Sequence, residues 1–169
     1  RNVGKSRSQG LELELNYLVT DSLSLGLNYT FTDATLEDDF FASATSGIPS
    51  ARAGERLPGS AKNSYALFVD WRHSLTAQSD IVARATHRYI GDRVNELGDD
   101  SNGVAFLPSY SITDLRASVE YDNDLTISLF ADNIFNEVVV LRQFRAGSFL
   151  DLVQISRPRT VGLSVGYRF

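Results

Sequence analysis

The sequence predicts an all-β fold, namely an antiparallel, up-and-down segment of a transmembrane β-barrel with about seven strands. Three observations predict it. Apolar residues alternate with small or polar residues at a period of two, and no long segment has a helical period. Short and long connections alternate between the predicted strands. Aromatic residues gather toward both ends of the apolar face, with aliphatic residues between them.

The first four predicted strands form two pairs. In residues 11–19 and 23–31 every second side chain is apolar and belongs to one face of the sheet. The sequence Thr-Asp-Ser at residues 20–22 separates them as a short turn. Residues 63–72 and 81–89 repeat the pattern around a turn at residues 73–79. Each pair is therefore expected to form an antiparallel hairpin.

Three further strands complete the predicted sheet. They cover residues 110–121, residues 125 to about 135, and residues 160–169. The sequence Asp-Asn-Asp at residues 122–124 is the turn between the first two of these strands. Phe68, Val82 and Phe130 interrupt the polar side, so the alternation is good but imperfect.

The connections differ in length according to the end of the sheet at which they lie. Those at residues 20–22, 73–79 and 122–124 are short, whereas those at residues 33–60, 92–108 and 136–157 are long. Successive antiparallel strands place alternate connections at opposite ends of a sheet. One end is therefore expected to have tight turns, and the other end elaborate loops.

The aromatic residues separate a membrane-spanning wall from a soluble β-sandwich, which also alternates. Tyr and Trp side chains suit the two membrane interfaces, and tilted strands of about ten residues span a bilayer core. A sandwich core has no reason to sort its aromatic residues toward both ends. The predicted interface residues are Tyr17, Trp71, Tyr121, Tyr167 and Phe169 at the short-turn end, and Tyr29, Phe31, Tyr65, Tyr89 and Phe135 at the loop end.

The opposite face contains charges of both signs, which suits a water-filled lumen. A soluble β-sandwich acting as a binding or adhesion module is the alternative, and it would bury the apolar face within protein. A small membrane barrel with enzymatic activity is a weaker third reading, because we find no catalytic set. The charged residues of the polar face are Glu12, Glu14, Asp70, Arg84, Arg88, Asp114, Arg116, Glu120, Asp132 and Arg168.

The composition excludes several functional classes. A net charge of −5 over 169 residues provides no basic surface for nucleic acid. The absence of cysteine excludes disulfides, thiol nucleophiles and cysteine-ligated zinc. We expect no enzyme, no metal site and no cofactor. The chain begins with Arg1 and contains no methionine, so we expect it to be a piece of a longer polypeptide.

Seven segments resemble, in the right order, the C-terminal part of the TonB-dependent outer-membrane receptors, which are β-barrels that import iron complexes and other scarce nutrients. Residues 59–61 and 138–140 depart from the family's usual loop sequences, which touches loop details and not the barrel. The seven segments are KSRSQGLELELNY, LNYTFTDA, GERLPGSAKNS, RYIGDR, LPSYSITDLRASVEY, LFADNIFNE and PRTVGLSVGYRF.

This resemblance implies that residues 1–169 are the C-terminal portion of such a barrel, without its plug domain and earlier strands. It implies a bacterial outer-membrane location in contact with lipid, with the C-terminus and short turns in the periplasm and the long loops outside. It also implies contact with TonB through the absent N-terminal part. The cargo is expected to be a small nutrient, with ferric siderophores the first expectation.

The last predicted strand alternates up to a terminal aromatic residue. In the resembled family, such a strand looks like the signal read by the barrel-assembly machinery, and a strand with a free edge can be captured by β-augmentation. A simple role for Phe169 as an interface anchor is the alternative. The matching positions are Val161, Leu163, Val165, Tyr167 and Phe169.

The last long loop contains the candidate ligand contacts Arg142, Phe144 and Arg145. Many ferric siderophores are anionic and contain aromatic rings, which guanidinium groups and a phenyl ring could hold by charge and cation–π contact. The alternative is a solvated, mobile loop.

Other polar residues are weaker candidates. The run Glu37-Asp38-Asp39 could bind calcium, but such runs are more often solvated loops. His73 and His87 lie in different elements without ligand-spaced partners, and His87 is expected at the membrane interface.

Overall fold

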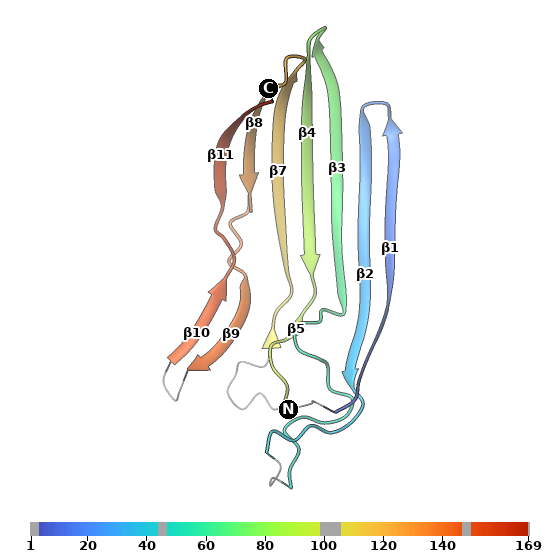
Figure 1. The fold of residues 1–169 in the computed structure, drawn as a ribbon, viewed down its shortest axis with the longest axis vertical. Coiled ribbons are helices and arrows are strands. Elements are labelled where there is room, and N and C mark those ends of the chain that lie inside the picture. The colour runs from blue at the N-terminus through green and yellow to red at the C-terminus, as the bar shows by residue number, and fades with distance from the viewer. Residues whose placement is uncertain (1–3, 44–46, 99–105, 147–149, 169) are drawn as a thin grey trace.

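The computed structural model describes residues 4–43, 47–98, 106–146 and 150–168. Its main feature is one antiparallel sheet of seven strands in the order β1-β2-β3-β4-β7-β8-β11 (Figure 1). None of the described residues belongs to a helix long and apolar enough to cross a membrane. The strands of this sheet are β1 (Ser6–Thr20), β2 (Leu23–Leu36), β3 (Asn63–Thr76), β4 (Ser79–Ile90), β7 (Tyr110–Tyr121), β8 (Leu125–Asp132) and β11 (Thr160–Tyr167).

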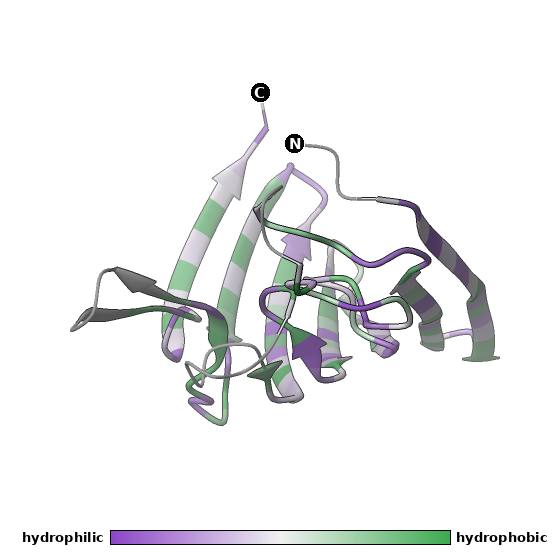
Figure 2. Cartoon of the chain, turned by 90° about the horizontal axis from the view of Figure 1, so that it is seen from below, coloured by the Kyte–Doolittle hydropathy of each residue, from purple (hydrophilic) through white to green (hydrophobic). Residues whose placement is uncertain are grey.

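The seven predicted wall strands are confirmed, and so is the division into a short-turn end and a loop end. The three short turns lie at the upper end of Figure 1 and the three long connections at the lower end. Each strand pairs with the next one along the wall, so the sheet runs up and down without a crossover between layers. Seen along its strands, the sheet is curved, and the bands of alternating hydropathy are visible in Figure 2.

The sheet is a single layer. Apolar side chains along the wall are exposed, for example Leu15 at 51% and Leu163 at 63%. A β-sandwich would need a second sheet packed on this face, and the described residues contain none. Among the described residues, the buried apolar side chains lie at the loop end instead, within or beneath the connections, and are Ala34, Leu36, Ala51, Leu107 and Val139.

The first hairpin is longer than predicted. Residues Ser6 to Leu36 pair continuously across β1 and β2, apart from a bulge between Leu18 and Thr20. The apolar alternation of β2 stops at Phe31 because Ala34 and Leu36 beyond it are buried under the first loop, only 7% and 2% exposed. The hairpin therefore extends past the predicted wall at the loop end. Residues of the first loop form backbone hydrogen bonds with this extension.

Two predicted boundaries were wrong. The turn predicted at residues 73–79 narrows to two residues, because β3 continues to Thr76 and β4 starts at Ser79, with their hydroxyl oxygens 2.7 Å apart. The strand predicted to reach about Phe135 ends at Asp132. Asn133 and Asn136 then adopt φ angles of 51° and 55°, which end the extended conformation.

The long connections contain strands that the alternation did not predict. β5 (Arg93–Val94) pairs with β6 (Phe106–Leu107), and β9 (Val140–Ala146) pairs with β10 (Leu150–Ile155). The second pair is a hairpin that projects from the wall at the loop end (Figure 1). Its segments contain consecutive apolar residues rather than an alternating pattern, which explains why the sequence predicts a loop there.

Two of the interruptions on the polar side have a structural reason. Phe68 lies opposite Gly26, and Phe130 lies opposite Gly162. A Cβ atom at Gly162 would be only 2.5 Å from Cζ of Phe130, and one at Gly26 would be 3.3 Å from Cδ2 of Phe68. Each phenyl ring therefore covers the strand at the place where its neighbour has no side chain, which is a known way to stabilise a glycine in a sheet.

Candidate functional site

The aromatic residues at the loop end of the apolar face form a continuous row. Tyr29, Tyr65 and Tyr89 lie directly opposite one another across β2, β3 and β4. The rings of Tyr65 and Tyr89 stack with centroids 5.2 Å apart, and the hydroxyl of Tyr29 donates to Oδ1 of Asn63 at 2.8 Å. Phe31 lies opposite Asn63 at the same end. The row has apolar rings with polar tips, as an interface between water and hydrocarbon requires.

The aromatic residues at the short-turn end are more widely spaced. Trp71 lies opposite Leu23 and stacks on His73, with ring centroids 5.7 Å apart. Tyr17, Tyr121 and Tyr167 lie near the turns on β1, β7 and β11. Phe169 lies outside the described residues. Phe135, predicted at the loop end, lies beyond the end of β8 and is 69% exposed.

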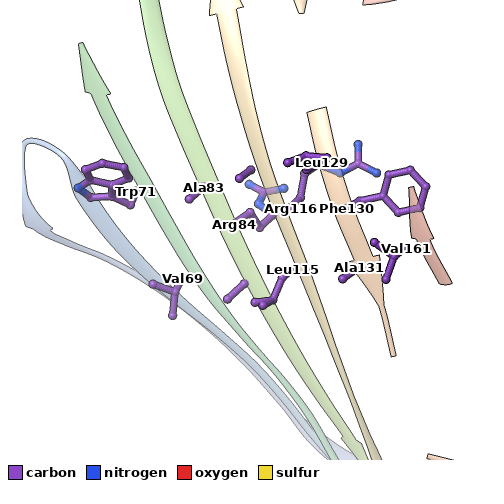
Figure 3. A pocket seen from close by; sticks show the side chains of 12 residues that line it. Val69, Trp71, Ala83, Arg84, Leu115, Arg116, Leu129, Phe130, Ala131 and Val161 are labelled. Atoms are coloured by element: carbon purple, nitrogen blue, oxygen red, sulfur yellow. The ribbon is translucent and has the colours of Figure 1, made fainter. Parts of the chain in front are cut away.

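A shallow hollow of about 440 Å³ lies on the apolar face between these two ends (Figure 3). Small side chains such as Ala83 form its floor, and Trp71, Leu115, Leu129 and Val161 stand around it. Arg84 and Arg116 also border it, but by strand alternation they belong to the opposite face. The hollow therefore offers hydrocarbon-like surface and no set of polar groups that could recognise a polar ligand.

The polar face is held together by ion pairs between neighbouring strands. Arg72 contacts Asp80 at 2.7 Å and Glu120 at 2.6 Å, which joins β3, β4 and β7. Arg84 pairs with Asp70. Arg88 pairs with Asp114, and the hydroxyls of Ser118 and Ser128 are 2.8 Å apart. Most of these groups keep partial exposure, so they suit a face that is in contact with water.

The three long connections are tied to one another at the loop end. Arg56 of the first connection contacts Asp92 of the second, with 2.6 Å between Nη1 and the carboxylate and 2.7 Å between Nη2 and the backbone carbonyl. Asn95 of the second connection binds the backbone of Gln143 in β9, donating to its carbonyl and accepting from its N–H at 3.2 Å. The described parts of the three connections are therefore linked to one another at the loop end of the wall.

The candidate ligand contacts lie in the third of these connections. Arg142 and Phe144 are both on β9, two residues apart, and the Arg142 guanidinium lies 5.8 Å from the centre of the Phe144 ring. Phe144 is 42% exposed. The backbone of Arg145 is in the same strand, but its side chain lies outside the described residues. The structure thus brings together two of the three predicted residues.

Asn133 is a residue whose role sequence reasoning missed. It is 4% exposed and joins both stems of the last connection: Nδ2 donates to the carbonyls of Glu137 and Arg157 at 2.9 and 3.1 Å, and Oδ1 accepts from the N–H of Glu137 at 2.9 Å. Its own N–H donates to Asp114 at 2.9 Å. The signal available was an asparagine at the end of an alternating run, a position that favours a left-handed backbone.

The acidic run has other partners in the structure. Oδ2 of Asp38 accepts from the backbone N–H of Lys5 at 3.3 Å, and Oδ1 of Asp39 accepts from that of Ala53 at 2.8 Å. His87 Nδ1 lies 2.8 Å from the Thr113 hydroxyl on the apolar face. Within the described ranges, no group of three or more acidic, histidine or cysteine residues could hold a metal ion.

The predicted assembly signal lies on a free edge of the sheet. β11 pairs with β8 and, among the described strands, with no other. Its four described signal residues are exposed: Val161 at 70%, Leu163 at 63%, Val165 at 62% and Tyr167 at 61%. Both the backbone edge and the alternating side chains of β11 are therefore accessible to a partner strand.

Comparison with known proteins gives consistent results. The family model of the TonB-dependent receptor-like β-barrel matches residues 1–134. The metal-pseudopaline receptor CntO of Pseudomonas aeruginosa is 26% identical over 166 residues, covering 98% of this chain and 21% of the relative. This chain therefore spans about a fifth of the length of that relative.

Two solved structures have the same fold as this chain. The ferric yersiniabactin uptake receptor FyuA of Yersinia pestis superposes with a TM-score of 0.75 at 20% identity, over 97% of this chain and 24% of that one. The siderophore receptor PiuA of Acinetobacter baumannii has a TM-score of 0.71 at 19% identity, over 98% of this chain and 22% of that one.

Proposed function

Because the chain belongs to the TonB-dependent receptor-like β-barrel family, we propose that it is the C-terminal portion of an outer-membrane, TonB-dependent active importer. In this proposal residues 1–169 supply barrel wall, three external loops and the signal for barrel assembly. The plug domain and the segment that contacts TonB belong to the part of the importer outside this sequence. The chain itself has no enzymatic role in the proposal.

The single observation that supports this function best is the exposure of an aliphatic wall. Aliphatic side chains on the seven strands face away from the ion-paired side of the same sheet, and no described protein layer covers them. Burying such a face in lipid gains roughly 25 cal/mol per Å² of apolar surface. In the membrane the aromatic rows would lie at the two interfaces, with the polar face toward the lumen.

The orientation follows from the same arrangement. Long loops at one end suit the external surface, and tight turns suit the periplasmic side. The C-terminus leaves β11 at the short-turn end, so we place it in the periplasm (Figure 1). There the free edge of β11 would be recognised by the barrel-assembly machinery.

For the cargo we propose a ferric siderophore. Arg142 and Phe144 present a cation and a ring on the same strand of the external hairpin, which suits an anionic ligand with aromatic groups. The names of two similar proteins, a metal-pseudopaline receptor and a ferric yersiniabactin uptake receptor, describe metal–chelate ligands. We expect the complete polypeptide to bind at least one member of a panel of ferric siderophores, and binding measurements with that panel would identify the ligand.

The fluorescence of Trp71, the chain's only tryptophan, tests the membrane assignment. In the complete polypeptide, other tryptophans would be replaced by phenylalanine, and the protein would be reconstituted into vesicles with lipid-borne quenchers. We expect quenchers near the headgroups to quench Trp71 more strongly than quenchers at the acyl-chain ends. The folded barrel should also migrate faster on gels before heating than after it. Insensitivity of Trp71 to every lipid-borne quencher would reject the proposal.

A further inference from the structure

One row of residues crosses the polar face through five strands. In register from β3 to β11 it consists of Asp70, Arg84, Arg116, Phe130 and Gly162. Two arginines therefore lie directly opposite each other on β4 and β7. Like charges at such a cross-strand pair destabilise a sheet unless a counter-charge is near. Only one end of this row contains a carboxylate.

The charge of Arg84 is balanced, but that of Arg116 is not. Arg84 forms its ion pair with Asp70, and the neighbouring arginines Arg72 and Arg88 also have carboxylate partners. Among the described residues, none places a carboxylate within 4.0 Å of the Arg116 guanidinium, whose recorded contact is the Phe130 ring. The nearby carboxylate of Asp114 is occupied, since Arg88 and the N–H of Asn133 bind its two oxygens.

Arg116 is also held in place. Its guanidinium carbon lies 5.7 Å from the centre of the Phe130 ring, within the range of a cation–π contact. That ring in turn covers Gly162, where any larger residue would collide with it. Figure 3 shows Arg84, Arg116 and Phe130 side by side on adjacent strands. The ring contact uses one face of the guanidinium and leaves its N–H groups available for an oxyanion.

We propose that Arg116, with Arg84 beside it and Phe130 beneath it, is an anion-binding position on the polar face, and that its ligand is a carboxylate. The planar fork of arginine matches a carboxylate in two parallel hydrogen bonds. The carboxylate comes either from a free solute or from an acidic side chain of the longer polypeptide outside residues 1–169. The site rests on the proposed function, in which this sheet is part of a larger barrel and its polar face lines a water-filled lumen.

Residue-resolved modification of arginine tests this site. The complete polypeptide in detergent, already shown to migrate as a folded barrel, would be treated with phenylglyoxal and mapped by mass spectrometry. Sodium formate and sodium chloride at equal ionic strength would be compared. The exposed loop residue Arg52 serves as the reactive reference and the carboxylate-paired Arg88 as the protected one. Because only folded barrel is examined, failure of the site is distinguishable from failure of the membrane assignment.

Two results support the proposal and identify the source of the carboxylate. Protection of Arg116 by formate but not by chloride indicates a free solute. Protection equal to that of Arg88 without formate, lost on unfolding, indicates an acidic side chain of the polypeptide. Modification of Arg116 as fast as that of Arg52, with and without formate, would overturn the proposal. The variant Arg116→Gln, checked for folded migration, should abolish any stabilisation by formate in thermal unfolding, whereas Arg88→Gln should keep it.

Discussion

At the scale of the residue, glycines with different surroundings occupy equivalent places on one strand. Gly162 and Gly166 both belong to β11, and both alternate to the polar face. Phe130 fills the space above Gly162, whereas nothing lies within 4 Å of a Cβ atom built at Gly166. An alanine at Gly162 would collide with the ring, whereas an alanine at Gly166 would not. Comparing the two substitutions therefore isolates the steric cost from the general stabilising effect of replacing glycine in a strand.

We predict that Gly162→Ala destabilises the folded chain by about 1–3 kcal/mol, because the Phe130 ring must shift to admit a methyl group. Gly166→Ala is the matched control and should be neutral or stabilising by up to about 1 kcal/mol, since alanine restricts the unfolded chain. Reversible urea unfolding in the presence of lipid vesicles would measure both free energies. Equal effects of the two substitutions would contradict the role assigned to the ring.

Residue-scale roles were the least predictable from sequence. Phe68 and Phe130 break the alternation, and the reason is visible only in the strand register, which places each of them opposite a glycine. Similarly, no pattern in the sequence distinguishes the paired Arg88 from Arg116, which has no carboxylate partner among the residues that the structure describes. Both facts depend on which residues meet across strands, and a shift of one position in register would change every such pair.

At the scale of the element, the wall strands were predictable because lipid and water impose a strict alternation on them. The loop hairpin of β9 and β10 was not, since its residues satisfy local packing and loop contacts instead. The ends of the strands were also misplaced where backbone hydrogen bonding continues past the apolar pattern, as in β2 beyond Phe31. The pattern therefore predicts the part of each strand that faces the membrane, rather than its hydrogen-bonded length.

Asn95 provides an element-scale prediction, because its side chain joins the second connection to β9. In Asn95→Ala the N–H and carbonyl of Gln143 lose their partner. We expect trypsin to cleave after Arg142 several times faster than in the unchanged protein, as the hairpin separates from its neighbour. Mass spectrometry of timed digests of the folded barrel would measure the rate.

The control for this prediction is Asn123→Ala at the opposite end of the sheet. The side chain of Asn123 accepts a hydrogen bond from the N–H of Leu125 in a short turn, 3.3 Å away. Its loss should leave cleavage after Arg142 unchanged. If both variants are cleaved at the same increased rate, the tie between the loops is not the cause.

At the scale of the whole molecule, the two faces of the sheet suit different surroundings, the apolar face lipid and the polar face water. Leu27 lies midway along the alternating residues 23–31 of β2, on the apolar face and opposite Leu15, whereas Asn28 is on the polar face opposite Glu14. We predict that Leu27→Arg costs about 2–4 kcal/mol, the penalty for a cation near the middle of a bilayer. Asn28→Arg should be tolerated, since it gains a carboxylate neighbour.

The measurement is again the free energy of unfolding in lipid vesicles, together with the fraction of folded barrel recovered from membranes. If the apolar face were instead the water-exposed exterior of a soluble protein, arginine on that face would be the better tolerated of the two substitutions, because charged side chains are stable on a hydrated surface. Comparable losses for both substitutions would mean that the two faces do not differ in their solvent.

The two free edges of the sheet differ in length, with 15 residues in β1 and eight in β11. The difference lies mainly at the loop end, because residues 6–10 of β1 precede the part that alternates toward the membrane. The membrane-facing lengths of the two edges, residues 11–19 and 160–167, are therefore nearly equal. In the proposed barrel both edges need a partner strand along that length, since each unpaired N–H or carbonyl group costs several kcal/mol in hydrocarbon.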